Sequence, residues 1–237
     1  MLERHIHSLR VERPASDETL AAARARLGEK FPRTALRRMT HLGLLVGAAL
    51  DGIAPGPDDA LVYATTFAET RALEDYLASF PTPSPLLFQT SIHPGAVQQV
   101  MIGRQQPLGR FWPLTGRRRL VEHALLTALL EPAPRVLLVG GEERGTWMLE
   151  HHMASDRAFA FALALTSEPA GAAGRVTFVP ASSGTGFLPV SLAKHGQDAH
   201  ATSDGPCPSL AGFTDALAER RPLHWRGAGG AWSIVWS

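Results

Sequence analysis

The sequence has a single cysteine, Cys207, in 237 residues. One thiol excludes a disulfide framework, so we expect a protein of the reducing cytoplasm. No apolar run reaches the roughly 18 residues that a membrane-spanning helix needs. The first residues, MLERHIHSLRVERP, are charged where a signal peptide would be apolar, which argues against export.

The sequence also has no large excess of positive or negative charge, since the formal net charge is +1 and the isoelectric point is near 8.1. The composition therefore gives no electrostatic reason to expect binding to nucleic acid or to an anionic membrane. With 45% hydrophobic residues, the chain has enough apolar side chains for a sizeable core. We expect a globular protein of one large domain or two small ones.

Segments of strand and helix character alternate along the chain. Apolar runs predict strands at 60–66, 135–143, 157–168, 174–180 and 231–237, and the segment 109–116 is predicted as a strand or a loop. Three- and four-residue apolar spacing or helix-forming composition predicts helices at 16–30, 31–50, 68–80, 117–131 and 209–220. Strands interleaved with helices imply right-handed crossovers, so the sequence predicts an α/β protein with a mostly parallel sheet and helices on its faces.

No pattern for metal or cofactor chemistry is present. The paired histidines lack the i, i+4 spacing and the acidic third ligand of a helical zinc site. The glycines that follow the strand at 135–143 do not have the spacing of a dinucleotide fingerprint, and the two glutamates beside them would repel a pyrophosphate. We therefore predict no metal and no cofactor.

Candidate nucleophiles are equally few. The chain contains no Gly-x-Ser-x-Gly elbow. Cys207 lies between two prolines, away from any evident helix N-terminus that would lower its pKa. These patterns favour a structural or incidental thiol.

Three arginines, Arg117, Arg118 and Arg119, stand at the predicted start of a helix, where the helix dipole disfavours cations. Two interpretations remain open. They are solvated arginines that precede the helix proper, or a cluster that meets an acidic partner or a phosphate group.

Three stretches carry a more specific pattern. They are LRRMTHLGLLVGAAL at 36–50, SPLLFQTSIHPGAVQQ at 84–99 and RVLLVGGEE at 135–143. In this order and spacing they resemble the N-terminal half of the β-ketoacyl synthases. The chain looks most like the short ketosynthase-like proteins of aryl polyene and xanthomonadin-type pigment clusters.

The matches can be named residue by residue. This sequence matches the family's Ser-Pro-x-x-Phe-x-x-Ser-Val-His-Asn-Ala junction from Ser84 to His93, with Ile92 in place of Val. It departs from the junction at Pro94 and Gly95. The family's Gly-Gly-x-Glu strand end is matched at Gly140, Gly141 and Glu143. The resemblance covers residues 33–166 and is moderately specific because three motifs are in register.

The resemblance implies a thiolase-like fold, truncated to the ketosynthase N-terminal half. We expect residues 1–166 to form this half. Residues 167–237 are then an irregular linker with a short C-terminal helix and strand that complete the same domain.

The departures bear on activity. A working ketosynthase carries its nucleophilic cysteine at a strand-to-helix elbow, a position that falls near Leu114 to Gly116, where this chain has no thiol. Thr115 is a poor substitute, because a hydroxyl needs a neighbouring base in order to attack a thioester. The downstream histidine motifs of the family are missing as well. The chain thus resembles a chain-length factor, the non-catalytic partner that pairs with an active β-ketoacyl synthase.

In the family, the segment matching residues 84–99 lies at the dimer interface and reaches the acyl pocket of the neighbouring subunit. The resemblance therefore implies no catalytic residue, docking of an acyl carrier protein at Arg117, Arg118 and Arg119, and an acyl-tunnel or interface set. That set is Leu86, Leu87, Phe88, Ile92, His93, Val97, Phe111 and Trp112. The alternative is that Leu86, Leu87 and Phe88 are simply core, since apolar residues are usually inside.

Two other readings remain. One is a thiolase-fold acyltransferase or thioesterase with a relocated nucleophile, either Cys207 or a serine such as Ser182 or Ser91. The other is an unrelated α/β binding protein in which the three motif matches are coincidence.

Overall fold

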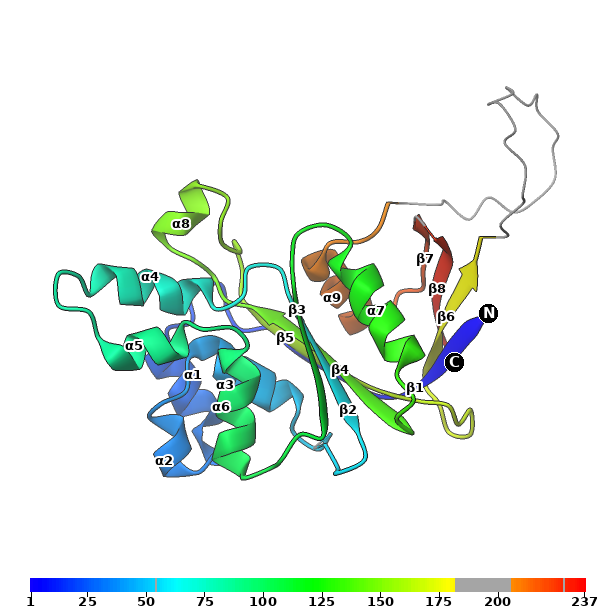
Figure 1. Cartoon of the computed structure of the whole chain (residues 1–237), viewed down its shortest axis with the longest axis horizontal. Coiled ribbons are helices and arrows are strands. Elements are labelled where there is room, and N and C mark those ends of the chain that lie inside the picture. Colours follow the sequence, from blue (N-terminus) through cyan, green and yellow to red (C-terminus); the bar gives the residue numbers. More distant parts are fainter. Residues whose placement is uncertain (54, 182–205, 228) are drawn as a thin grey trace, which may run out of the picture.

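The computed structural model describes residues 1–53, 55–181, 206–227 and 229–237. In these residues, eight strands form one sheet in the order β3-β2-β4-β5-β1-β6-β8-β7 (Figure 1). The strands are β1 (Leu2–Glu12), β2 (Ala60–Thr65), β3 (Arg110–Thr115), β4 (Arg135–Glu142), β5 (Phe159–Thr166), β6 (Gly174–Pro180), β7 (Leu223–Gly227) and β8 (Gly230–Trp236).

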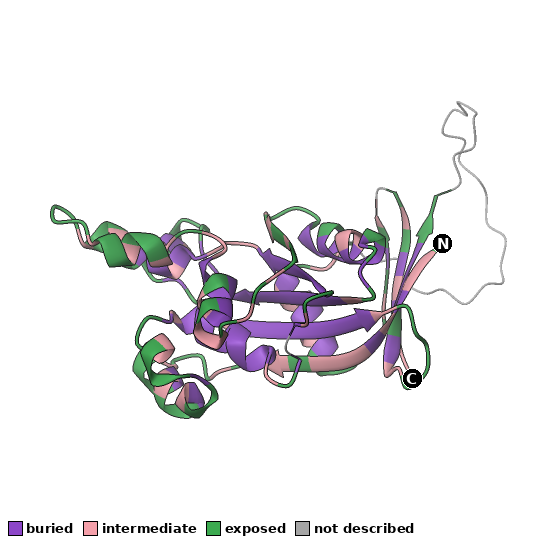
Figure 2. Ribbon diagram, turned by 60° about the horizontal axis from the view of Figure 1, so that its bottom comes forward, coloured by how far each residue is buried: buried purple, intermediate pink, exposed green. Residues whose placement is uncertain are grey.

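Helices cover both faces of the sheet. They are α1 (Leu20–Leu27), α2 (Arg33–Leu36), α3 (His41–Ala49), α4 (Thr70–Ala78), α5 (Pro85–Thr90), α6 (Gly95–Arg104), α7 (Leu120–Leu130), α8 (Trp147–Glu150) and α9 (Leu210–Ala218). One apolar core joins α1, α3 and α6 to the sheet, and a second joins α7 and α9 to its other face. Figure 2 shows the buried strands between these layers and the exposed α4–α5 arm that extends from them.

The α/β class is confirmed, but the expected mostly parallel pairing is corrected to a mixed sheet. Strand β2 pairs in parallel with β3 and β4. The other five pairings, from β4–β5 to β7–β8, are antiparallel. Helical crossovers produce parallel neighbours, whereas β4 and β5 are joined without a full crossover helix and so run in opposite directions.

Strand β1 is central to the sheet, although no strand is predicted there from the sequence. It lies between β5 and β6 and is paired on both edges. A bulge between Ile6 and Ser8 shifts the side-chain alternation, so that Leu2 and Ile6 but also Leu9 and Val11 reach the same core. Because the period of two is broken, the strand does not show as an alternating pattern in the sequence.

The helix predicted over 31–50 is divided in two. Between α2 and α3 the chain turns, and α3 begins after Thr40, whose hydroxyl accepts a hydrogen bond from the Gly43 N–H at 3.0 Å. Threonine at this position is a typical N-cap. All nine residues of α3 are buried, so this helix forms the centre of its core.

The Gly-Gly pair at the end of β4 has a packing reason. A Cβ atom at Gly140 would lie 2.5 Å from the Phe161 ring on the neighbouring strand. Only glycine leaves room for that ring. Among the described residues, no helix is both long enough and apolar enough to cross a bilayer.

Candidate functional site

The turn between β3 and α7 occupies the place where the resemblance puts a nucleophile. Strand β3 ends at Thr115 and α7 begins at Leu120. The connection is Gly116, Arg117, Arg118 and Arg119, and Arg119 has a left-handed backbone with φ of 55°. The Gly116 N–H donates to the Thr65 carbonyl at 3.3 Å, which fixes the turn to β2. The strand-to-helix geometry is present, but glycine and arginines fill it.

The three arginines lie before α7, not inside it. The Arg117 guanidinium donates to the His152 carbonyl and lies 5.0 Å from the centroid of the Phe67 ring. Arg119 Nε is 4.0 Å from Glu122 Oε2. All three side chains are exposed, so the arginines are available to a partner although two of them also have contacts within the chain.

The two candidate nucleophiles within the described residues, Cys207 and Ser91, have no activating group among their described contacts. Burial, and secondarily the neighbouring Glu122, raise the pKa of the Cys207 thiol to about 11. This thiol therefore stays protonated at neutral pH, and the thiolate is the reactive form. The Ser91 hydroxyl donates to the Phe88 carbonyl at 2.8 Å, with no base beside it among its described contacts. Ser182 lies outside the described residues.

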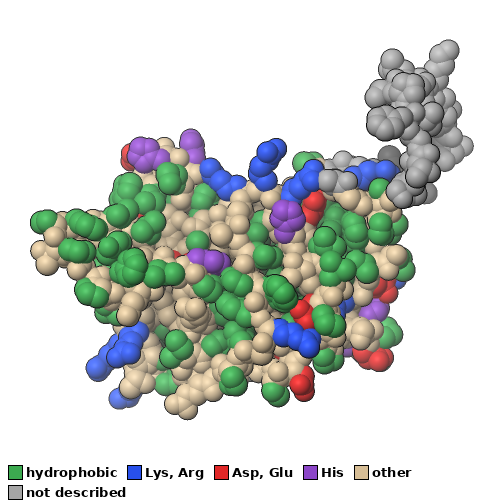
Figure 3. Space-filling model, viewed as in Figure 1, with side chains coloured by type: hydrophobic (Ala, Val, Ile, Leu, Met, Phe, Trp, Pro, Cys, Tyr) green, Lys and Arg blue, Asp and Glu red, His purple; other side chains and the backbone are tan. Residues whose placement is uncertain are grey.

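The LLF run lies on α5, which the sequence analysis did not predict as a helix. Ser84 is its N-cap and Pro85 its first residue, a favoured combination. Leu86 is 54% exposed and Phe88 is 49% exposed, while Leu87 is half-buried. The core alternative is therefore wrong for Leu86 and Phe88. Figure 3 shows hydrophobic side chains gathered over α4 and α5.

The other members of the predicted interface set are divided between surface and interior. Ile92 and Trp112 are each 47% exposed, whereas Val97 is fully buried within α6 and supports the surface from below. Phe111 is half-buried and packs against the core under α3 and α6. The structure thus brings Leu86 and Ile92 to one surface but places Trp112 at the edge of the sheet.

His93 has a defined environment between two elements. Its Nδ1 is 3.2 Å from Glu69 Oε2, and its ring stacks on Tyr63 of β2 at 5.4 Å. Glu69 also accepts the Ala96 N–H at 3.0 Å and so caps the start of α6. Burial strongly raises the pKa of Tyr63, with the nearby glutamates adding to the effect, so this hydroxyl stays protonated.

A groove of about 1070 Å³ lies between α2, α5 and α6. Leu86, Ile92 and Ile102, the last 77% exposed, give it an apolar surface. Arg37, Arg38 and Arg104 line it as well, and none of its described lining residues carries a carboxylate. An apolar surface with positive charges and no acid of its own is typical of a contact surface for another molecule.

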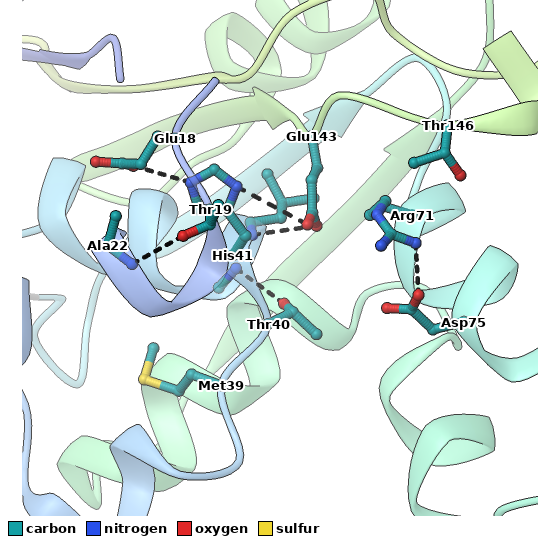
Figure 4. Close-up of polar contacts among 12 residues, drawn as sticks. Glu18, Thr19, Ala22, Met39, Thr40, His41, Arg71, Asp75, Glu143 and Thr146 are labelled. Atoms are coloured by element: carbon teal, nitrogen blue, oxygen red, sulfur yellow. Dashed lines mark hydrogen bonds and ion pairs between the residues drawn. The ribbon is translucent and has the colours of Figure 1, made fainter. Parts of the chain in front are cut away.

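A smaller hollow of about 140 Å³ adjoins this groove and ends at a buried polar cluster that the sequence analysis missed (Figure 4). His41 Nε2 is 3.0 Å from Glu18 Oε2, and its Nδ1 is 3.9 Å from Glu143 Oε1. The Leu42 N–H donates to Glu143 at 3.3 Å, yet burial raises the pKa of Glu143 to about 7. A hydrogen bond from Arg26 is the main cause of the lowered pKa of Glu18.

Other glutamates at this end of the sheet accept hydrogen bonds from loop backbones. Glu142 accepts bonds from the Thr65 hydroxyl and from the N–H groups of Thr66 and Phe67, and burial raises its pKa to about 7. Glu74 accepts bonds from the Thr146 N–H and hydroxyl and from the Met148 N–H, all between 2.8 and 2.9 Å. These contacts are structural, because each carboxylate is occupied by protein donors. Across the described ranges, no group of three or more potential ligands could hold a metal ion.

Neither a protein-family model nor a curated protein matches this chain. Among solved structures, it is similar to a chain of the ketosynthase (ApeO) in complex with its chain length factor (ApeC) from Xenorhabdus doucetiae. The TM-score is 0.58 at 16% identity, over 99% of this chain and 100% of that chain.

Two further structures are more distantly similar. The tetronic acid condensing enzyme AbyA1 gives a TM-score of 0.40 at 16% identity, over 79% of this chain and 63% of that chain. A 3-oxoacyl-(acyl-carrier protein) synthase from Burkholderia xenovorans LB400 gives 0.35 at 14% identity, over 78% of this chain and 54% of that chain. Scores this low support no argument on their own.

The chain has a thiolase-like α/β fold. The expectation of this fold, drawn from the resemblance in the three sequence motifs, is confirmed. The likeness runs beyond residues 33–166 to nearly the whole chain.

Proposed function

We propose that this chain is a non-catalytic, ketosynthase-like subunit of the chain-length-factor kind. It pairs with an active β-ketoacyl synthase and shapes the acyl tunnel of that enzyme, in the biosynthesis of a polyene or fatty-acid-like pigment. The observation that carries the proposal is the β3–α7 turn, where Gly116 and three arginines stand in place of a nucleophile. The whole-length likeness to a chain of a ketosynthase and chain-length-factor complex supports it.

The alternative, an acyltransferase or thioesterase with a relocated nucleophile, is less well supported. It requires an activated side chain, and the Cys207 thiol has a raised pKa while Ser91 has no base among its described contacts. The two candidates differ in one measurable property, which is whether an acyl group becomes attached to this chain.

The test is to produce the chain together with an active β-ketoacyl synthase from the same organism, and to purify one through a tag on the other. We expect a stable complex, and we expect no acyl adduct by mass spectrometry when the chain alone is incubated with an acyl thioester. Failure to copurify would contradict the proposal. An adduct on Cys207 or on a serine would favour the alternative.

The α5 surface is the proposed wall of the acyl tunnel. Leu86, Phe88 and Ile92 are exposed in this chain, and Phe88 packs against Tyr76 at 5.4 Å, which holds its ring in place. We predict that Phe88→Ala and Leu87→Ala shift the product to longer chains while the complex still forms, because a smaller side chain lengthens the space. Product lengths equal to the wild type would count against this role.

Arg117, Arg118 and Arg119 are the proposed docking site for an acyl carrier protein, as an exposed cationic cluster suits an acidic surface. We predict that Arg118→Glu, the change with the fewest contacts to lose within the chain, weakens carrier-protein binding severalfold in low salt. The matched control is Arg33→Glu on α2, which is also exposed. Equal binding by both variants would remove this assignment.

A further inference from the structure

The hollow of about 140 Å³ that adjoins the large groove borders α5. Residues of α1, α4 and α5 line it, together with the segment between α2 and α3. Its apolar lining residues are Leu20, Met39, Ala72, Leu86 and Leu87. A cavity of about 150 Å³ with apolar walls accommodates a benzene molecule. The hollow therefore has room for an apolar body of about six carbon atoms.

The polar groups that line the hollow are not all satisfied by the chain. The Arg24 guanidinium donates through Nη2 to the carbonyls of Arg37 and Met39, at 3.3 and 3.2 Å. Its Nε is buried and has no partner within the described residues. His41 Nδ1 is 3.9 Å from Glu143 Oε1, which is too far for a direct hydrogen bond (Figure 4). A buried donor without an acceptor is costly, so Arg24 favours a ligand that brings an oxygen atom.

The charges around the hollow leave an excess of positive charge. The lining residues with a guanidinium group, and without an ion pair to any described residue, are Arg24, Arg37 and Arg38. Two carboxyl groups also line the hollow. Asp75 is compensated by Arg71 at 2.5 Å, and Glu143 keeps its proton up to about neutral pH because burial raises its pKa to about 7. The Glu18 carboxylate, outside the lining, is paired with Arg26 at 2.7 Å. The lining therefore suits an anion.

These properties together select the chemistry of a ligand. An anion without an apolar part, such as phosphate, would leave the apolar walls without contact. A hydrocarbon would leave the Arg24 N–H without an acceptor. A carboxylate with a short apolar body meets both requirements, because guanidinium groups bind carboxylates in a matched planar geometry.

We propose that the hollow binds a small monocarboxylate with an apolar body of about six carbon atoms, and that this ligand fixes the position of α5. The carboxylate contacts Arg24 and Arg38, and the body packs against Leu86 and Leu87. Because α5 carries the proposed tunnel wall, occupancy of the hollow regulates that wall. The regulatory part of this inference rests on the proposed function, whereas the binding site does not.

The binding test uses the purified chain alone and isothermal titration calorimetry, with hexanoate as the probe. We expect a Kd below about 1 mM, which a ligand of this size can reach. Hexanamide has the same body without the charge, and we expect it to bind at least about tenfold more weakly. No binding of hexanoate, or equal affinities of the two compounds, would overturn the site.

Two pairs of variants locate the ligand, with melting temperatures measured for all four. Thr90→Phe adds a ring to the lining and should weaken hexanoate binding at least about tenfold, whereas Gln89→Phe, which lines the groove but not the hollow, should not. Arg38→Gln should weaken binding about fivefold, and the matched control is the exposed Arg33→Gln, outside the lining. Wild-type binding by Thr90→Phe would overturn the proposed location. If Thr90→Phe does not fold, the two arginine variants decide it.

The regulatory part is tested on the complex with the β-ketoacyl synthase. We expect saturating hexanoate to change the distribution of product lengths for the wild type and not for Thr90→Phe. An unchanged distribution for the wild type would overturn the control of the wall. A chain that binds hexanoate but does not copurify with the synthase would leave the binding site in place and overturn the proposed function.

Discussion

The α5–α6 surface and the buried carboxylates of α4 and β4 reverse the usual placement of side chains. At the first, Leu86, Phe88 and Ile102 are apolar and exposed. In the second region, Glu74 and Glu142 carry carboxyl groups, which are normally exposed to water, yet both residues are buried. Among the described residues, the buried glutamates have donors within the chain, whereas the exposed apolar groups have no equivalent cover. The first region therefore has the character of a contact surface, and the second that of a structural core.

The comparison predicts that changes at the buried glutamates alter stability most. We expect Glu74→Ala to lower the free energy of unfolding by about 3 kcal/mol, because the donors on Thr146 and Met148 lose their acceptor. The matched control is Asp75→Ala, next in sequence, whose side chain is 48% exposed and pairs with Arg71. It should cost less than about 1 kcal/mol. Urea unfolding of both variants checks this, and equal costs would break the comparison.

A second prediction concerns pH. The pKa of Glu143 is raised to about 7 in the folded state, so the folded protein holds this proton more tightly than the unfolded chain between about pH 4.5 and pH 7. Stability therefore falls as pH rises through this window. The loss is up to about 3 kcal/mol, at about 1.4 kcal/mol for each pKa unit.

Glu143→Gln cannot ionise and should lose less stability than the wild type between pH 5 and pH 8. Urea unfolding at both pH values measures the difference, and the exposed Glu150→Gln serves as the control. A pH dependence in Glu143→Gln as steep as that of the wild type would show that Glu143 is not the group responsible.

The smallest effect on folding is expected at the exposed surface. Ile102→Ala should change the free energy of unfolding by less than about 0.5 kcal/mol, since its side chain is largely in water. Its neighbour on α6, Met101, is 5% exposed, and Met101→Ala should cost at least about 2 kcal/mol. Thermal melts of the two variants test the pair. A similar loss in both would mean that Ile102 is covered by the chain itself.

Much of the fold follows from local patterns. The apolar run RVLLVGGEE predicted β4, and ALVYATT predicted β2, because a strand buried on both faces must be apolar throughout. Strand β7 and helix α5 were missed because they are short, five and six residues, and carry weak periodicity. Strand β1 was missed for a different reason. Its bulge changes, partway along the strand, which of the alternating positions face the core.

The candidate site was predictable only in part. The missing thiol near Leu114 to Gly116 is a fact of the sequence, and so is the cluster of arginines. The exposure of Leu86 and Phe88 cannot be predicted from the sequence, since an apolar run has the same pattern in the core and on the surface. The contacts of Glu131 could not be predicted either, because its partners Arg110 and Trp112 come from another element.

The order of amino acids alone determined the α/β class, most strands and the absence of a cysteine at the β3–α7 turn, since these depend on neighbours a few residues apart. Only the tertiary structure decided which glutamates are buried and which apolar side chains are left uncovered. Burial is set by contacts between distant segments, such as Glu74 with Thr146 and Glu131 with Trp112, and no local pattern encodes them.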